Sequence, residues 1–253
     1  MLPRTPSFRL DGRRALVTGA GRGLGAATAA ALAQAGAHVT LCARSCDEIE
    51  EIADAIRNEG GVADTLTLDV TNVTDVQKAL SERSAFHILV NNAGTNRPKP
   101  FVEVSSDDFD AVIDLNLKAA FFVAQTVARG MMNARQGGSI IHMSSQMGHV
   151  GGQNRTIYCA SKAGIEGLSK AMAIDLAPHN IRVNTVGPTF IETPMTKPFL
   201  SDPAFQSTVL SKIKLGRLGR VEDVMGAVVF LASDAAALIT GAALLVDGGW
   251  TAD

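Results

Sequence analysis

Short apolar runs alternate with longer helical patterns along the whole of the 253-residue chain. Several of these runs are unbroken stretches of Val, Ile and Leu, which is typical of strands buried on both faces of a sheet. Repeated strand–helix units predict a parallel sheet with helices on both faces, so we expect an α/β fold of the Rossmann type, doubly wound, with about seven parallel strands. The strands are predicted at Arg14–Thr18, His38–Ala43, Ala63–Leu68, His87–Asn91, Ser139–Met143, Arg182–Val186 and Ala243–Val246.

Helical patterns fill the intervals between these runs, near Gly23–Ala35, Asp47–Asn58, Thr74–Arg83, Ser106–Met132, Thr156–Ala177 and Glu222–Ser233. No linker, repeat or low-complexity tract divides the sequence, so residues 1–253 are predicted to form a single dinucleotide-binding catalytic domain. Residues 189–220 interrupt the alternation with three prolines and short helical pieces. A long insertion after a strand is often a substrate lid, and a plain surface excursion is the alternative.

Charge and cysteine content exclude several classes of protein. The net charge of −2 gives no general affinity for nucleic acid or for anionic membranes. Three cysteines, at positions 42, 46 and 159, form neither a disulfide framework nor a spaced metal set, so no metal site is expected. The first residues lack the apolar core of a signal peptide, and no apolar run approaches the ~18 residues that span a bilayer. We expect a soluble, cytoplasmic protein.

A glycine-rich loop lies where the first predicted strand meets the first predicted helix. It reads Thr18-Gly19-Ala20-Gly21-Arg22-Gly23-Leu24-Gly25. Such a turn lets a pyrophosphate approach the backbone, while the helix N-terminus supplies free N–H groups and a positive dipole. The loop therefore indicates a dinucleotide site, and a tight glycine turn that holds no ligand is the alternative. A Walker-type loop is excluded because no Gly-Lys-Ser/Thr ends the segment.

The end of the second predicted strand bears on the choice of cofactor. In NAD-binding folds an acid about 20 residues beyond the glycine loop holds the adenosine ribose. Here the strand ends at Arg44 with no acid. Arg44 and Arg22 can instead pair with a 2′-phosphate, which favours NADP(H), with NAD(H) possible; two solvated loop charges are the alternative. Asp69, after the third strand, is expected either to bind the adenine amino group or to cap the next helix.

Tyr158 and Lys162 are spaced four residues apart in a predicted helix, and Tyr158 is the only tyrosine of the chain. Residues at this spacing lie one above the other on the same face. A lysine ammonium beside a tyrosine favours the phenolate, so we expect Lys162 to lower the pKa of Tyr158 from its reference near ~10. Such a phenol can give a proton to a carbonyl oxygen or take one from an alcohol. An exposed pair without a function is the alternative.

Several motifs in a fixed order resemble those of the short-chain dehydrogenase/reductase family, over almost the whole chain. The spacing from Ser145 to Tyr158 is the one found in that family, and Asn116 falls at its expected place on the long helix. The motifs are, in chain order, Thr18–Gly25, Asn91-Asn92-Ala93-Gly94, Asn116, Ser145, Tyr158 with Lys162, and Asp247-Gly248-Gly249.

This resemblance implies an NADP-preferring oxidoreductase acting on CH–OH groups, and it implies residue roles. Tyr158 is the general acid/base, Lys162 lowers its pKa and binds the nicotinamide ribose, and Ser145 donates a hydrogen bond to the substrate oxygen. Asn116 holds a water that links Lys162 to solvent. Residues implied to bind the cofactor are Gly19, Gly21, Arg22, Gly23, Leu24, Gly25, Arg44, Asp69, Val70, Asn92, Ala93, Gly94, Tyr158, Lys162, Pro188, Thr189, Ile191 and Thr193.

One position departs from the family pattern. Family members usually read Pro-Gly after the sixth strand, whereas this chain reads Pro188-Thr189. Because threonine has a Cβ, we expect the backbone there to avoid the conformations that only glycine allows.

Polar residues near the catalytic set suggest a polyhydroxylated or acidic small molecule as the alcohol or ketone substrate. They are Asn96, Arg97, Gln146, His149, Asn154 and Arg155. A loop histidine without a ligand role is the alternative for His149. The local pattern Asn96-Arg97-Pro98, with Phe101 after it, resembles that of gluconate-type sugar-acid dehydrogenases. Within the family, the chain as a whole is closest in pattern to gluconate- and sugar-type dehydrogenases and to 3-oxoacyl reductases.

Three functional hypotheses remain open at this point. The first is a dehydrogenase/reductase of a sugar, polyol or sugar acid, and the second is a 3-oxoacyl-thioester reductase. The third is a non-catalytic nucleotide-binding regulator, which the complete Ser145, Tyr158 and Lys162 set disfavours. Family members commonly bury the two long helices between subunits, so a homotetramer is expected.

Overall fold

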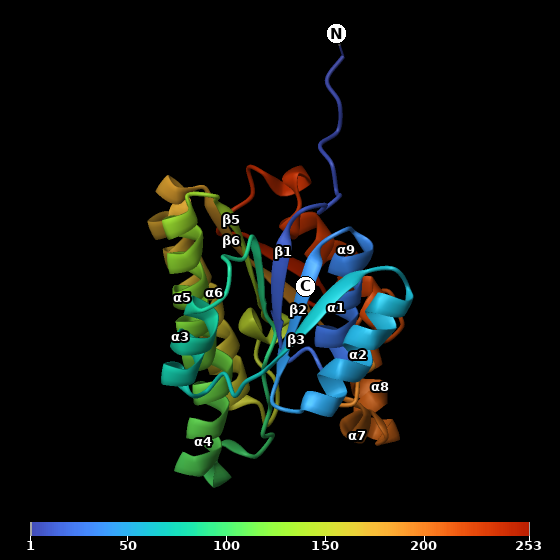
Figure 1. Cartoon of the computed structure of the whole chain (residues 1–253). Helices are drawn as coiled ribbons and strands as arrows, with labels where there is room; N and C mark the ends of the chain where they lie inside the picture. The colour runs from blue at the N-terminus through green and yellow to red at the C-terminus, as the bar shows by residue number, and fades with distance from the viewer. Residues whose placement is uncertain (1, 253) are drawn as a thin grey trace.

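Seven parallel strands form one sheet in the order β3-β2-β1-β4-β5-β6-β7. The computed structural model describes residues 2–252, and Figure 1 shows the sheet seen between two layers of helices. The predicted α/β architecture of the Rossmann type is confirmed. The strands are β1 (Arg14–Thr18), β2 (His38–Ala43), β3 (Val62–Thr67), β4 (Ile88–Asn91), β5 (Gly138–Met143), β6 (Ile181–Pro188) and β7 (Ala243–Val246).

Helices cover both faces of the sheet (Figure 1). One layer contains α1 (Gly23–Gln34), α2 (Cys46–Asn58) and α9 (Val221–Ala232). The other contains α3 (Val73–Ser81), α4 (Ser106–Ile113), α5 (Ala120–Ala134) and α6 (Thr156–Leu176). Since every strand pair is parallel, all the strands end at the same edge of the sheet.

Successive apolar residues in each strand are buried in opposite layers. Leu16 and Ile140 belong to the core under α5, whereas their neighbours Val17 and Ile141 belong to the core under α1 and α9. Side chains alternate across a strand, so a strand covered on both faces needs an unbroken apolar run. This burial explains why the strands were recognisable in the sequence.

The predicted helix Ser106–Met132 is wrong in one respect, because a π-helical turn interrupts it. α4 ends at Ile113, the π turn spans Asp114–Ala119 (η2), and α5 then continues to Ala134. Together Ser106–Ala134 is long and apolar enough to cross a membrane by length and composition, with a mean hydropathy of 1.3. Its apolar residues Val123, Val127 and Met131 are instead buried in the core beneath the sheet.

Smaller differences concern element ends. β3 begins one residue earlier than expected, at Val62, and β6 extends to Pro188. α3 ends at Ser81 instead of Arg83, in agreement with the short connection to β4. Within residues 189–220 the chain forms two helices, α7 (Lys197–Leu200) and α8 (Pro203–Lys212), coloured orange in Figure 1.

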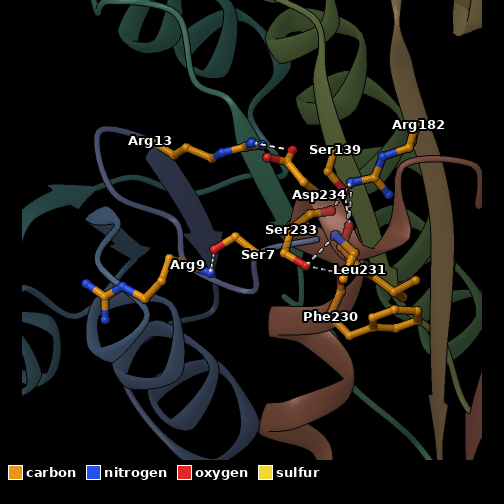
Figure 2. Close-up of polar contacts among 10 residues, drawn as sticks. Ser7, Arg9, Arg13, Ser139, Arg182, Phe230, Leu231, Ser233 and Asp234 are labelled. Carbon is orange, nitrogen blue, oxygen red and sulfur yellow. Dashed lines mark hydrogen bonds and ion pairs between the residues drawn. The ribbon is translucent and has the colours of Figure 1, made fainter. Parts of the chain in front are cut away.

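The C-terminal end of α9 is tied to the sheet by side-chain donors (Figure 2). Ser139 Oγ and Arg182 Nη2 both donate to the Leu231 carbonyl, each at 2.8 Å, and Arg182 also reaches the Ser233 carbonyl at 3.2 Å. The last carbonyls of a helix have no partner within the helix, so these bonds satisfy groups that burial would otherwise leave unpaired. They fix α9 at the edge of the sheet opposite the strand ends.

Candidate active site

The glycine loop is locked to the end of β4. Thr18 Oγ1 accepts hydrogen bonds from the amides of Asn92 and Ala93, at 3.0 and 3.1 Å. Asn92 Nδ2 donates to the Gly19 carbonyl at 3.1 Å. Gly19 has a φ of +63°, and a Cβ there would lie 2.9 Å from Ala93 Cα, so only glycine fits. Two motifs more than seventy residues apart thus form one rigid floor.

The N-terminus of α1 is open for an anion. Its N-cap residue, Arg22, makes no side-chain capping bond, and the first turn contains no acidic residue. A Cβ at Gly25 would lie 2.0 Å from the Gly19 carbonyl, so this glycine lets the loop fold tightly onto the helix. The first N–H groups of a helix lack partners within the helix and attract phosphate. This uncapped end fits the pyrophosphate of a dinucleotide.

Arg44 lies exposed just beyond the end of β2, and no ion pair to it is found among residues 2–252. Arg22 is less free, since its Nη1 lies 3.6 Å from Glu48 Oε1. Arg44 and Asp69 both line a cavity of about 490 Å³ between the strand ends and α3. Arg44 and Arg22 thus place two positive charges near the glycine loop.

Asp69 serves as a turn residue. Its Oδ1 accepts from the Thr71 amide at 2.9 Å and from the Thr71 hydroxyl at 2.7 Å. These bonds hold the pKa of Asp69 below its ordinary value, with a further contribution from the charge of Arg44. The expectation that Asp69 might cap the next helix is wrong, because Asn72 caps α3 by accepting from the Asp75 amide. Val70 beside it is buried.

Tyr158, Lys162 and Ser145 meet at the carboxyl edge of the sheet. Lys162 Nζ donates to the Met143 carbonyl at 2.7 Å and lies 5.6 Å from the centre of the Tyr158 ring. Ser145 follows β5 and is buried, where its Oγ accepts from the Met147 amide at 3.1 Å and donates to Gln146 Oε1 at 2.7 Å. The predicted trio is therefore brought together by α6 and the end of β5.

The pKa of Tyr158 shifts in the direction opposite to the one expected. Burial raises it above the ordinary value, and a hydrogen bond with Ser145 offsets the rise only in part. Lys162 is not among the causes of this shift. Burial acts on its amine as well and lowers the pKa of Lys162 to about 8. Desolvation disfavours both the phenolate and the ammonium. The raised pKa of Tyr158 therefore favours the neutral phenol over the phenolate.

Asn116 sits in the π turn and is almost fully buried. Its Oδ1 accepts from the Thr95 amide at 2.8 Å, and its Nδ2 donates to the Thr95 carbonyl at 3.0 Å and to Ser161 Oγ at 3.1 Å. A Cβ at Gly94 would lie 3.3 Å from Asn116 Oδ1 and 3.8 Å from Lys162 Nζ. The π turn therefore directs Asn116 at the loop after β4, beside the lysine.

The end of β6 brings the next segment to the glycine loop. A Cβ at Gly23 would lie 3.5 Å from Thr193 Cβ, so the two are neighbours. Ile191 is buried, and Pro188 is the last residue of β6. Thr189 adopts an ordinary backbone, as expected, since it is not among the described non-glycine residues with positive φ. The Thr189 Oγ1 is buried without a hydrogen-bond partner within residues 2–252, so the segment after β6 contains an unsatisfied hydroxyl.

An apolar wall closes one side of the site. Met147, Phe190, Val209 and Ile213 form a buried cluster, against which Tyr158, Phe205 of α8 and Trp250 pack. The Phe190 ring stacks on Trp250 with centroids 5.7 Å apart and meets Phe205 edge-on at 5.6 Å. α8 and Tyr158 thereby pack against the same cluster.

The predicted substrate residues fall into three groups. Arg97 is paired with Asp108 at 3.3 Å, and His149 Nε2 lies 3.3 Å from Glu166 Oε1, so both have partners within the protein. Asn154 is exposed with a φ of +58°, and Asn96 is half-buried. Gln146, next to Ser145, and Arg155, three residues before Tyr158, are buried at 2% and 7% exposure.

Three contributors to the site escaped the sequence prediction. Glu166 is buried on α6 one turn beyond Lys162, and the Thr185 hydroxyl donates to it at 2.9 Å. Its spacing of four from Lys162 was the signal that marked it. Asp108 and Phe199 carry no such mark, since their partners lie on other segments. Within residues 2–252, no group of three or more His, Cys, Asp or Glu side chains is arranged to hold a metal ion.

The chain is similar in sequence and fold to several known proteins. A family model described as enoyl-(acyl carrier protein) reductase matches residues 19–251. D-erythrulose reductase of Gallus gallus is 39% identical over 97% of this chain and 98% of its own length. The 3-oxoacyl-[acyl-carrier-protein] reductase of Thermotoga maritima is 41% identical over 96% of this chain and 99% of its own. A gluconate 5-dehydrogenase from Burkholderia cenocepacia, solved with NADP and tartrate, superposes with a TM-score of 0.94 at 38% identity, over 97% and 98% of the two chains.

Proposed function

The chain belongs to the short-chain dehydrogenase/reductase family, and on that premise we propose that it interconverts a secondary alcohol and a ketone of a sugar, polyol or sugar acid, with NADP(H) as its preferred cofactor. The observation that carries this proposal is the meeting of Tyr158, Lys162 and Ser145 at the strand ends, beside a glycine loop whose helix is uncapped. A proton donor, a cation and a hydroxyl donor around one opening are the groups that carbonyl reduction requires.

The uncapped end of α1 would hold the cofactor's phosphates, with the loop residues Gly19, Gly21, Gly23, Leu24 and Gly25. Arg44 and Arg22 would bind the 2′-phosphate, which is the reason for preferring NADP(H) over NAD(H). The unpaired Thr189 hydroxyl would bind a polar group at the nicotinamide end. The remaining residues proposed to contact the cofactor are Asp69, Val70, Asn92, Ala93, Gly94, Pro188, Ile191 and Thr193.

When bound, the nicotinamide supplies or accepts the hydride at the reacting carbon. In the reductive direction, the neutral Tyr158 phenol gives its proton to the substrate oxygen. Ser145 turns its O–H from Gln146 toward that oxygen and stabilises the developing negative charge. Lys162 would bind the hydroxyls of the nicotinamide ribose, and Asn116 holds the loop after β4 beside the amine.

Residues 189–220 are proposed to act as the substrate lid. α8 packs on the wall that includes Tyr158, and Thr193 lies against the glycine loop, so both ends of the segment touch the site. Long insertions after a sheet strand often serve this purpose.

We also propose a cytoplasmic homotetramer. Phe109 and Phe121 expose 48% and 41% of their surface along α4 and α5, and Ile174 exposes 76% at the end of α6. Large apolar side chains exposed together on helices often mark a contact between subunits. Analytical ultracentrifugation of the purified protein tests the oligomeric state.

A substrate panel assayed with NADPH, NADH and their oxidised forms tests the function. We expect turnover of gluconate-type acids, polyols or ketoses, with a lower KM for the phosphorylated cofactor. A strong preference for acetoacetyl thioesters would instead assign the second hypothesis, which the relative from Thermotoga maritima keeps open. Cofactor binding without any turnover would favour the regulator.

A further inference from the structure

Arg155 is a buried cation without a carboxylate partner. Its side chain is only 7% exposed, yet none of the ion pairs found among residues 2–252 includes it. The one side-chain hydrogen bond found for it among residues 2–252 runs from Nη1 to the neighbouring Asn154 carbonyl at 3.4 Å, and its guanidinium lies 4.9 Å from the centre of the Phe199 ring. Burial lowers the pKa of Arg155. A guanidinium held this way loses part of its hydration without gaining an anion.

Two other arginines near the site and in the core have partners that Arg155 lacks. Arg97, the second arginine predicted near the substrate, pairs with the buried Asp108. Arg182 is also largely buried, but it donates to the carbonyls of Leu231 and Ser233. Arg14 Nε is buried without a hydrogen-bond partner among residues 2–252, but Arg14 begins β1, at the edge of the sheet opposite the strand ends. Of the two arginines predicted near the substrate, Arg155 is therefore the one without a carboxylate partner in the described chain.

Its position places those donors beside the reacting group. Arg155 is the N-cap residue of α6, a helix of 21 residues whose first turn contains no acid. It precedes Tyr158 by three residues, and side chains at this spacing are neighbours, with Cβ atoms roughly 5–6 Å apart. The charge of Arg155 acts on the tyrosine, lowering its pKa against the effect of burial. The helix N-terminus adds a positive field at the same point.

We propose that Arg155 binds a carboxylate of the substrate, so that the enzyme prefers a sugar acid over the neutral polyol of the same carbon chain. This inference rests on the proposed function and adds the substrate class. The planar guanidinium offers paired N–H donors that match a carboxylate. Stacking on Phe199 of α7 fixes the plane of the guanidinium and links recognition of the acid to the segment 189–220.

The test compares two substrates that differ only in this group. Gluconate and glucitol share their carbon chain, and the acid has a carboxylate where the polyol has a hydroxymethyl group. We expect kcat/KM with NADP+ to favour gluconate, and Arg155→Gln to reduce that acid/polyol ratio about 30-fold, the size of one charge-assisted pair. Arg155→Lys keeps the positive charge but loses the paired N–H donors of the guanidinium. We therefore expect this variant to retain part of the preference for gluconate over glucitol. Arg129→Gln, at an exposed site on α5, is the matched control.

A binding measurement separates this inference from the proposed function. Calorimetric titration of the NADP+-saturated wild-type protein with tartrate and with threitol, its neutral counterpart, requires no turnover. Tighter binding of tartrate, lost in Arg155→Gln, supports the proposal even where neither sugar is a substrate. Equal affinity for the two compounds would overturn it, as would a ratio that collapses in Arg97→Gln but survives in Arg155→Gln.

The thermal stability of the Arg155→Gln variant distinguishes a ligand-binding arginine from one that only stabilises the fold. Because the buried charge is unpaired, Arg155→Gln is expected to leave the Tm of the ligand-free protein unchanged or higher. A marked loss of Tm together with an unchanged acid/polyol ratio would show that Arg155 is a packing residue, and the proposal would fall.

Discussion

Arg22 lies 3.6 Å from Glu48, Nη1 to Oε1, at the open end of the glycine loop. The pair is largely exposed, with 72% of the arginine side chain and 43% of the glutamate accessible to solvent. Surface pairs of this kind contribute little to stability. The relationship therefore bears on the cofactor: while it pairs with Glu48, Arg22 is less available to a 2′-phosphate.

Replacing Glu48 with Gln is expected to tighten NADPH binding by about 2–5-fold, the range that one exposed charge pair permits. The affinity for NADH should change less, because that cofactor lacks the phosphate. Fluorescence titration with both cofactors measures the effect, and Glu51→Gln on the same helix is the control. Weaker NADPH binding in Glu48→Gln would show that the glutamate positions Arg22 for the phosphate.

Arg44→Asp should reverse the cofactor preference. The arginine is exposed at the end of β2 without an ion pair in the described chain, so the change leaves no buried partner unsatisfied. We expect NADPH to bind about 10–100-fold more weakly, since a charge-assisted pair is replaced by repulsion. The affinity for NADH should stay within about 3-fold of its original value, because NADH lacks the 2′-phosphate that Arg44 is proposed to bind. Equal losses for the two cofactors would remove the 2′-phosphate role.

Tyr158→Phe is expected to lower kcat by about 10²–10⁴-fold, which is what general acid/base catalysis supplies. Cofactor affinity should be nearly unchanged, because the ring remains and only the hydroxyl is lost. Since burial raises the pKa of Tyr158, reduction should proceed well at neutral pH, whereas alcohol oxidation, which needs the phenolate, should accelerate as pH rises. Stopped-flow measurement of both directions separates these effects. A variant that keeps its rate would reassign the proton donor.

The fold was predictable because its pattern is local. A strand such as β5 alternates its side chains between two cores, and this demands an apolar run that is visible without any coordinates. The π turn was not predictable from periodicity. It depends on bonds from Asn116 to Thr95 and Ser161, which lie 21 and 45 residues away. A π turn closes its hydrogen bonds over one residue more than an α-helix does, and this local change is not visible in the spacing of apolar residues.

The site shows the same division. Spacing placed Tyr158 and Lys162 on one helical face, and the set of motifs around them made the pair a candidate site. The predicted direction of the Tyr158 pKa shift was wrong because burial exceeds the effect of neighbouring charges here. That burial depends on tertiary packing, which places the ring against the cluster of Met147, Phe190, Val209 and Ile213. The sequence likewise treated Arg97 and Arg155 alike. Only the structure shows that Asp108 neutralises the first and leaves the second unpaired.

Glu166 is expected to set the pH range in which Lys162 is charged. Burial lowers the pKa of this lysine to about 8, and the carboxylate one turn away raises it against that effect. Glu166→Gln removes the charge but can still accept from Thr185, so Lys162 should lose its proton at a lower pH.

If catalysis requires the ammonium, the alkaline limb of kcat/KM in the Glu166→Gln variant should move to lower pH by about one unit or less, a size typical of one nearby charge. His149 faces the same carboxylate at 3.3 Å, so His149→Gln is measured beside it to separate the two groups. Asp175→Asn, exposed near the end of α6, is the matched control.

The stability of the folded protein has a predictable sign as well. Because the pKa of Lys162 is lower folded than unfolded, the unfolded chain binds more protons between about pH 8 and its ordinary value of 10.5. This lysine therefore makes folding more favourable as pH rises through that window, where the buried charge disappears. In the Glu166→Gln variant this rise in the free energy of unfolding should begin at a lower pH. Urea unfolding measured across that pH range tests it. An alkaline limb and a stability profile that coincide with those of the wild type would show that Glu166 does not control the charge of Lys162.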